Sequence, residues 1–245
     1  MEHIYLLPLT FHRGETENII YPVLLKDENE LILVDCSYPD TMPMLEEAMQ
    51  KLGFSLSMLT KIIITHHDHD HMGALQEITL QYPQIEVLCS KEQAPYITGK
   101  CKSLRLQQAE DLQDTLPEHK KEYGKQFQKL IASVKPVADV TIIETGAILP
   151  YCGGIEVVDT KGHMPGHISL YVKKEKALIT GDALVIVNGK LCMALPQYAL
   201  NMEEAKDSVR KLEGYDIETI ICYHGGVCDD DAKITLKRVI AGLSL

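Results

Sequence analysis

The chain has 245 residues, 45% of them apolar and 24% charged, a balance typical of a globular protein with one large core. Its net charge of −11, from 24 basic and 35 acidic residues, argues against a nucleic-acid partner, because no basic stripe is present to neutralise phosphates. No apolar run approaches the roughly 20 residues that a membrane helix needs.

The amino-terminal residues and the cysteines indicate a cytoplasmic protein. The stretch from Met1 to Tyr5 lacks the basic and apolar blocks of a signal peptide. Seven cysteines, an odd number without a Cys-x-x-Cys motif, predict neither a disulfide framework nor a zinc ribbon. We therefore expect a reducing compartment.

The first half of the chain alternates β-rich and amphipathic runs. We expect strands over 4–9, 18–26, 31–34, 61–64 and 85–89, and helices over 41–52 and 73–81. The loop between the first two strands holds His12. Strands separated by helices in this way predict an α/β fold.

Six consecutive residues that can all ligate a metal follow the strand over 61–64; they are His66, His67, Asp68, His69, Asp70 and His71. A polar turn that caps the next helix would explain one or two of them. In an extended loop, alternate residues point the same way, so His66, Asp68 and Asp70 can line one side. If the loop turns into a helix near Asp70, then Asp70 and His71 diverge and can address a second metal.

The segment 91–136 is polar and helical in pattern, and we expect two or three helices there. This segment is too short to bury its own core easily, so we predict that it is an insertion in a single domain that spans residues 1–245. Two placements remain open. The insertion either covers the active site as a cap or packs away from the metals.

The second half returns to strands, over 140–143, 155–158, 169–172, 177–180 and 219–222. Asn201 opens a helix with Glu204 three residues on, as in a capping box. A last helix begins at Asp229–Asp231, where acidic residues suit the positive end of the helix dipole. Strands followed by helices in both halves suggest two sheets packed face to face with helices outside.

The histidine–aspartate cluster resembles the His-x-His-x-Asp-His signature of the metallo-β-lactamase superfamily. In this frame His66 takes the first position, and Asp68 stands where most members carry a second histidine. Ala74 replaces a frequent second glycine. A frame that begins at His67 loses the Asp-His pair, so we prefer the first.

Three later strand ends match the family's remaining motifs. Thr160–His167 resembles the loop Thr-Pro-Gly-His-Thr-Pro-Gly-His, which makes His163 a ligand and His167 a structural histidine. Asp182 follows Gly181 as the family's bridging aspartate does. His224 matches the last ligand.

The resemblance implies an αββα sandwich of two mixed β-sheets with helices on the outer faces, plus the helical insertion. It also implies two divalent metal ions, with Zn²⁺ expected first and Fe or Mn as alternatives. One ion takes His66, Asp68 and His163. The other takes Asp70, His71 and His224, with Asp182 between them. The carboxylate of Asp68 favours harder cations, or leaves only one metal tightly bound.

The implied activity is that of a hydrolase with a metal-activated water, in which Asp70 and Asp182 are the catalytic residues. A β-lactamase would carry an export signal, and glyoxalase II carries a further helical domain. Lactonases that cleave acyl-homoserine lactones place a tyrosine where this chain has Val185. We therefore expect a small ester, thioester or lactone as substrate.

Two other functions remain open: an iron-dependent redox enzyme of the same fold that reduces oxygen or nitric oxide or oxidises a persulfide, and a non-catalytic metal-binding protein. Candidate substrate contacts in loops near the site are Tyr38, Tyr198, Tyr223 and His12. The segment 185–198 is expected in the pocket wall. We expect no membrane partner and consider a homodimer.

Overall fold

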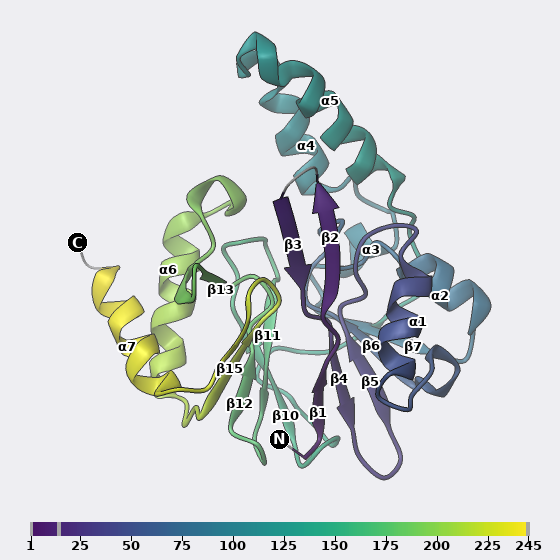
Figure 1. Cartoon of the computed structure of the whole chain (residues 1–245), viewed down its shortest axis with the longest axis vertical. Helices are drawn as coiled ribbons and strands as arrows, with labels where there is room; N and C mark the ends of the chain where they lie inside the picture. The colour runs from purple at the N-terminus through teal and green to yellow at the C-terminus, as the bar shows by residue number, and fades with distance from the viewer. Residues whose placement is uncertain (1, 14–15, 244–245) are drawn as a thin grey trace.

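The computed structural model describes residues 2–13 and 16–243, without the side chains of residues 13 and 16. Its elements form four layers in the order helix, sheet, sheet, helix (Figure 1). Three clusters of buried apolar side chains fill the three spaces between these layers. The predicted αββα sandwich is therefore confirmed.

The first sheet has six strands and is mixed. Their order is β1 (Ile4–Leu6), β4 (Val23–Lys26), β5 (Leu31–Val34), β6 (Lys61–Ile64), β7 (Glu86–Cys89) and β8 (Thr141–Ile142). Strand β4 is antiparallel to both of its neighbours, whereas each neighbouring pair from β5 to β8 is parallel. Helices α1 (Met42–Gln50) and α2 (Leu75–Gln81) cover the outer face.

The second sheet also has six strands, in the order β16 (Gly226–Cys228), β15 (Thr219–Cys222), β12 (Ala177–Ile179), β11 (Ile168–Val172), β10 (Ile155–Asp159) and β9 (Ile148–Leu149). Helices α6 (Met202–Lys211) and α7 (Ala232–Gly242) cover it. The Asn201 side chain accepts a hydrogen bond from the Glu204 backbone N–H at 3.2 Å, so the predicted cap of α6 is confirmed.

Alternation along the strands distributes side chains between the layers. In β6, Ile62 and Ile64 pack toward α1 and α2, whereas Ile63 packs toward the second sheet. All three are fully buried. Successive strand residues point to opposite faces, so a strand that is buried on both sides has an uninterrupted apolar sequence. The apolar run at 62–64 predicts this strand for that reason.

Two β-hairpins lie outside the two six-stranded sheets: β2 (Leu9–Arg13) with β3 (Thr16–Ile20), and β13 (Leu184–Val187) with β14 (Lys190–Met193).

The prediction of one continuous strand over 4–9 and another over 18–26 is wrong, because each range is divided between two strands. Pro8 and Pro22 separate β1 from β2 and β3 from β4, because proline lacks the N–H that a continuous ladder needs. Strand β2 includes His12, so its predicted place in a loop is also wrong.

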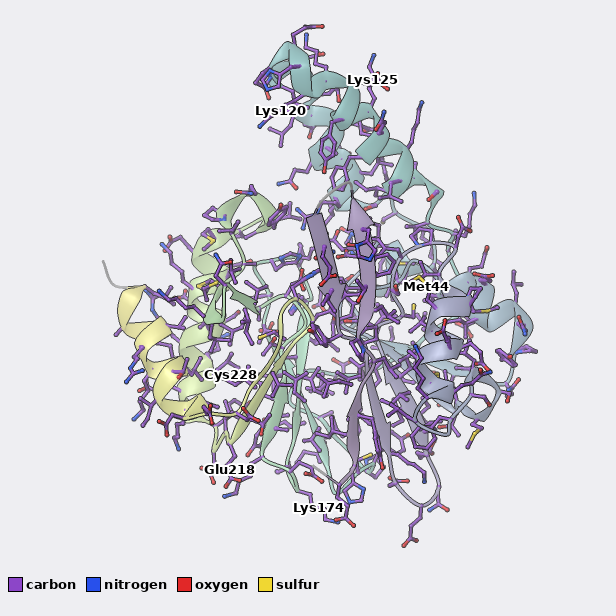
Figure 2. All side chains as sticks on the ribbon, in the orientation of Figure 1. Met44, Lys120, Lys125, Lys174, Glu218 and Cys228 are labelled. Atoms are coloured by element: carbon purple, nitrogen blue, oxygen red, sulfur yellow. The ribbon has the colours of Figure 1, made fainter. Side chains whose placement is uncertain are left out.

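The segment 91–136 contains α3 (Ala94–Ile97), α4 (Leu104–Asp111) and α5 (Glu118–Ser133). It connects β7 to β8, which are neighbours in the first sheet. Helices α4 and α5 lie side by side and extend beyond the sandwich (Figure 1). Figure 2 shows Lys120 and Lys125 near their outer end. None of the helices in the described ranges is long and apolar enough to cross a membrane.

Short 3-10 helices complete the described elements: η1 (Leu56–Met58), η2 (Gln113–Thr115), η3 (Pro196–Tyr198) and η4 (Leu212–Gly214). The carboxyl ends of the parallel pairs β5–β6 and β12–β15 converge on one edge of the sandwich. The Ile168 N–H donates to the Thr65 carbonyl at 3.2 Å and joins the two sheets there. Loops from both sheets therefore meet at this edge, as strand ends do in layered α/β folds.

Gly73 ends the histidine–aspartate loop at a close backbone approach. Its N–H donates to the Ser37 carbonyl at 2.8 Å. A Cβ at this position would lie 2.2 Å from the Pro39 nitrogen and 2.4 Å from the His69 carbonyl oxygen. Only glycine fits there without backbone movement.

We therefore expect Gly73→Ala to lower the free energy of unfolding by about 3 kcal/mol, the upper end of the usual cost of overpacking. Urea denaturation measures this change. Gly242→Ala is the matched control, because nothing lies within 4 Å of its added Cβ; its stability should be unchanged or slightly raised. Equal stability of the two variants would contradict the packing argument.

Candidate metal centre

The histidine–aspartate loop turns sharply after its first three residues. The backbone N–H groups of His71 and Met72 both donate to the Asp68 carbonyl, at 3.0 and 3.1 Å. The Cys36 N–H, at the end of β5, donates to the His71 carbonyl at 2.7 Å. The loop therefore turns near Asp70 without becoming a helix, since α2 begins only at Leu75, and it brings His71 into one donor group with His66.

All seven side chains predicted to bind metal converge at the common edge of the sheets. Their ligand atoms form three groups, each within 4.8 Å: His66, Asp68 and His163; Asp70, His71 and His224; and His66, His71 and Asp182. The first two groups match the two predicted sites, and the third joins them. Six of the seven residues are buried, and His224 is partly exposed.

Asp182 lies between the two predicted groups. Its Oδ1 is 3.2 Å from His71 Nε2 and 3.6 Å from His224 Nε2, while its Oδ2 is 3.6 Å from His163 Nε2. Asp70 Oδ2 lies 3.3 Å from His224 Nε2. One carboxylate therefore faces both groups, which is the position expected for a bridging ligand.

Three inward-facing atoms of the cluster fit a cation. His66 Nε2, His71 Nε2 and Asp182 Oδ1 are buried and form no hydrogen bond among the described residues, although His71 Nε2 and Asp182 Oδ1 lie 3.2 Å apart. Buried polar atoms are almost always hydrogen-bonded, and imidazole nitrogen and carboxylate oxygen are transition-metal ligands. The donor set thus suits a divalent metal ion.

Hydrogen bonds from the outer ring nitrogens orient the inner ones. His71 Nδ1 lies 2.8 Å from Asp35 Oδ2, and His66 Nδ1 lies 3.0 Å from Thr65 Oγ1. Asp35 in turn accepts from the backbone N–H and the hydroxyl of Thr65, both at 2.8 Å. A carboxylate behind a ligating histidine fixes its tautomer and orientation.

His167 orients Asp182, as expected of a structural histidine. Its Nε2 accepts from the Asp182 N–H at 3.0 Å, so its Nδ1 carries the proton and donates to Thr160 Oγ1 at 2.9 Å. Burial holds the pKa of His167 well below its usual value and keeps the ring neutral. Both ring nitrogens are engaged within the protein.

Burial and crowded charges shift the pKa values of the cluster. Burial lowers the pKa of His66 to about 4, and the neighbouring His71 adds to this effect. Burial also disfavours charged His71, but the carboxylates of Asp182 and Asp35 outweigh it and hold its pKa well above 6.5. Burial opposes ionisation of Asp182, yet His224 and His71 hold its pKa well below 3.8. The carboxylates are therefore charged at neutral pH.

Arg105 reaches the cluster from α4, and no sequence pattern singles it out. Its Nε lies 3.1 Å from each oxygen of Asp68, and its Nη2 donates to Asp68 Oδ2 at 2.8 Å. Burial disfavours ionised Asp68, but the Arg105 charge outweighs it and holds the pKa of Asp68 well below 3.8. Arginine is common on polar helices, so only the tertiary contact reveals this one.

The insertion covers the metal loop, which decides between its two predicted placements. His67 Nε2 accepts from the Leu104 N–H at 3.2 Å, and the His67 ring stacks on Tyr96 with centroids 4.3 Å apart. Phe127 of α5 packs edge-on against His69 at 5.3 Å. Because His67 engages the insertion rather than the cluster, the frame that begins at His67 is wrong.

The four candidate substrate contacts occupy different environments. Tyr223 is buried, and its hydroxyl donates to the Asp70 carbonyl at 2.5 Å, so its expected contact with substrate is wrong. His12 is exposed on β2 and faces away from Phe11, whose ring packs on Tyr38 at 4.8 Å. Half-buried Tyr38 also contacts His69, and Tyr198 is half-exposed. Tyr38, Tyr198 and His12 remain candidates.

A hollow of about 10 Å³, room for roughly one water molecule, opens beside His163 and Asp182. Its other lining residues are small or apolar: Thr160, Ala183, Met193, Ala194, Ala199 and Ala205. Met193 and Ala194 belong to the segment 185–198, so that segment contributes to the pocket wall as expected.

An αββα sandwich with a buried histidine–aspartate cluster at the common edge of its sheets defines a class of metal-binding α/β proteins. Within that class, the model of the metallo-β-lactamase superfamily matches residues 16–224. The chain belongs to this superfamily.

Curated relatives and solved structures agree with this assignment. The chain is 28% identical over 229 residues to a probable metallo-hydrolase, YflN, of Bacillus subtilis, covering 85% of this chain and 80% of the relative. It is 25% identical over 210 residues to a hydroxyacylglutathione hydrolase of Aliivibrio fischeri, covering 85% of this chain and 62% of that protein. The fold is similar to the metallo-β-lactamase family protein TTHA1429 of Thermus thermophilus, with a TM-score of 0.74, 21% identity, and coverage of 100% and 80%.

Asp35 is the residue whose hydrogen bonds most directly orient the cluster. We expect Asp35→Asn to weaken Zn²⁺ binding roughly 10- to 100-fold, the usual cost of losing a carboxylate behind a ligating histidine. Asparagine tolerates the positive φ of 58° found here. Competition with a chromophoric chelator measures the affinity. Exposed Asp207→Asn is the control, and equal affinities of the two variants would refute the supporting role of Asp35.

Proposed function

We propose that this protein is a metal-dependent hydrolase that directs an activated water at the carbonyl of a small ester, thioester or lactone. The observation that carries the proposal is the buried cluster itself, with His66, His71 and Asp182 presenting unpartnered donor atoms to one centre. Such donors suit Zn²⁺ first and Fe or Mn as alternatives.

A divalent cation supplies Lewis acidity at such a site: it lowers the pKa of a water held against it from about 15.7 toward 7 and polarises a substrate carbonyl. The protein supplies the orientation. Asp182 faces both donor groups and is the residue proposed to hold the attacking water. Asp70, ionised at neutral pH because His69 and His71 outweigh the cost of its burial, is proposed to carry the proton toward the leaving group.

Cys36, a cysteine in contact with the cluster, is a poor nucleophile. Cys36 is fully buried, and its thiol donates to the His71 carbonyl at 3.3 Å. Burial and the neighbouring Asp35 raise its pKa well above 9.0, so the thiolate is scarce at neutral pH. This supports an activated water rather than a covalent thioacyl intermediate.

A relative supports a thioester among the candidate substrates. The hydroxyacylglutathione hydrolase of Aliivibrio fischeri, 25% identical to this chain over 210 residues, is named for the hydrolysis of a glutathione thioester.

A turnover screen tests this proposal. Purified protein, stripped with a chelator and reloaded with Zn²⁺, Mn²⁺ or Fe²⁺, is assayed on esters, thioesters, lactones and phosphodiesters. We expect hydrolysis of at least one carbonyl class, loss of activity in the stripped protein, and recovery on reloading. Oxygen consumption by the iron form without hydrolysis would instead favour a redox enzyme.

Asp182→Asn should reduce kcat by more than the roughly 100-fold that loss of a supporting hydrogen bond costs, because it removes the charge that faces both donor groups. Asp216→Asn, at an exposed ion pair with Lys176, is the control and should retain activity. Full turnover by Asp182→Asn on the substrate identified in the screen would exclude the proposed role of this residue.

A further inference from the structure

Arg105 is an unusual neighbour for a metal site because it is a fixed positive charge beside two of the predicted ligands. Its side chain is 5% exposed. Besides Asp68, its Nη2 lies 3.2 Å from His163 Nε2 and donates to the Tyr198 carbonyl at 2.8 Å, and its Nη1 donates to Gln108 at 2.6 Å. The guanidinium is thus held from several sides.

These contacts engage two of the three residues in the first donor group, Asp68 and His163, and leave His66 Nε2 free. Both oxygens of Asp68 accept hydrogen bonds from Arg105. His163 Nε2 is engaged in either tautomer, because it accepts from Arg105 or donates to Asp68 Oδ2 at 3.2 Å. A ring nitrogen has one lone pair, so it cannot accept a hydrogen bond and ligate a metal at the same time.

The second donor group has no such cation. Within the described part of the chain, the ion-pair partners of Asp70 and Asp182 are all histidines. Without a lysine or arginine, these two buried carboxylates take their positive charge from protonated histidines or from a metal ion. A single divalent cation can supply it and leave the imidazoles neutral, as ligands must be.

The unpartnered atoms indicate where that cation binds. His66 Nε2, His71 Nε2 and Asp182 Oδ1 lie within 4.8 Å of one another in one donor group. His66, assigned by resemblance to the first site, therefore also faces the second. His71 also belongs to the donor group of Asp70 and His224, so these two residues lie beside the same centre.

We propose that the Arg105 guanidinium replaces the first metal ion, so that the chain binds one divalent cation, at His66, His71 and Asp182 with Asp70 and His224. This inference rests on the proposed metal dependence and revises the expectation of two ions. The two changes compensate each other. Asp68 adds a negative charge where a neutral histidine is usual, and Arg105 balances that charge in place of a metal ion.

Metal stoichiometry tests the proposal without reference to activity. Chelator-stripped protein is saturated with Zn²⁺, desalted, and analysed by elemental analysis and native mass spectrometry. We expect one ion per chain in the wild type and two in Asp68→His/Arg105→Met, which restores the neutral ligand and removes the competing charge. Arg210→Met, at a partly exposed arginine paired with Asp207, is the control and should retain one ion.

Two tightly held ions in the wild type would overturn this inference and leave the proposed hydrolase intact, whereas no tightly held ion would overturn the proposed function itself. A single ion in the folded double variant would also overturn the inference, because Arg105 would not then be what excludes the second. If the double variant fails to fold, Asp68→His/Arg105→Gln replaces it, since glutamine can still donate to the Tyr198 carbonyl. If that variant also fails, the wild-type count decides.

Discussion

The electrostatic cost of burying four carboxylates together is the constraint on which the rest of this structure depends. Asp35, Asp68, Asp70 and Asp182 are all buried beside the imidazoles of one cluster. Charges so placed destabilise the folded state unless cations balance them. Asp35 is paired with His71 and Asp68 with Arg105, and we propose that a divalent metal ion balances the other two. The helical insertion that brings Arg105 to the cluster is thus part of the site.

The same constraint explains why the site is built from both sheets. Asp35 follows β5, the histidine–aspartate loop follows β6, Asp182 follows β12 and His224 follows β15. The first sheet supplies His66, Asp68, Asp70 and His71 and the second supplies the other three ligands, so the complete cluster forms only when the sheets pack against each other. Metal binding to such a cluster stabilises the packed state over its separated parts, because binding energy at a site absent from the unfolded chain adds to folding energy.

The αββα layers could be predicted from apolar strands followed by helices. The seven ligands could be predicted because four strand-end motifs, taken in order, resemble those of the metallo-β-lactamase superfamily. Pro8 and Pro22 divide two predicted strands, and the hairpin β13–β14 was not predicted at all. Arg105 could not be found, since an arginine on a polar helix resembles any solvated residue until its tertiary contact is known. Tyr223 illustrates the opposite error: a tyrosine beside a ligand suggests substrate contact, but here its hydroxyl is used to hold the Asp70 backbone.

The central claim is that the cluster binds a divalent cation at the centre faced by His66, His71 and Asp182. Anomalous diffraction at the zinc edge, from crystals of Zn²⁺-loaded protein, tests it most directly. The account predicts a strong peak roughly 2.0–2.2 Å from the ligand atoms of His71 and Asp182, with Arg105 still bonded to Asp68. An anomalous map with no peak inside this cluster, from protein that holds zinc elsewhere, would contradict it.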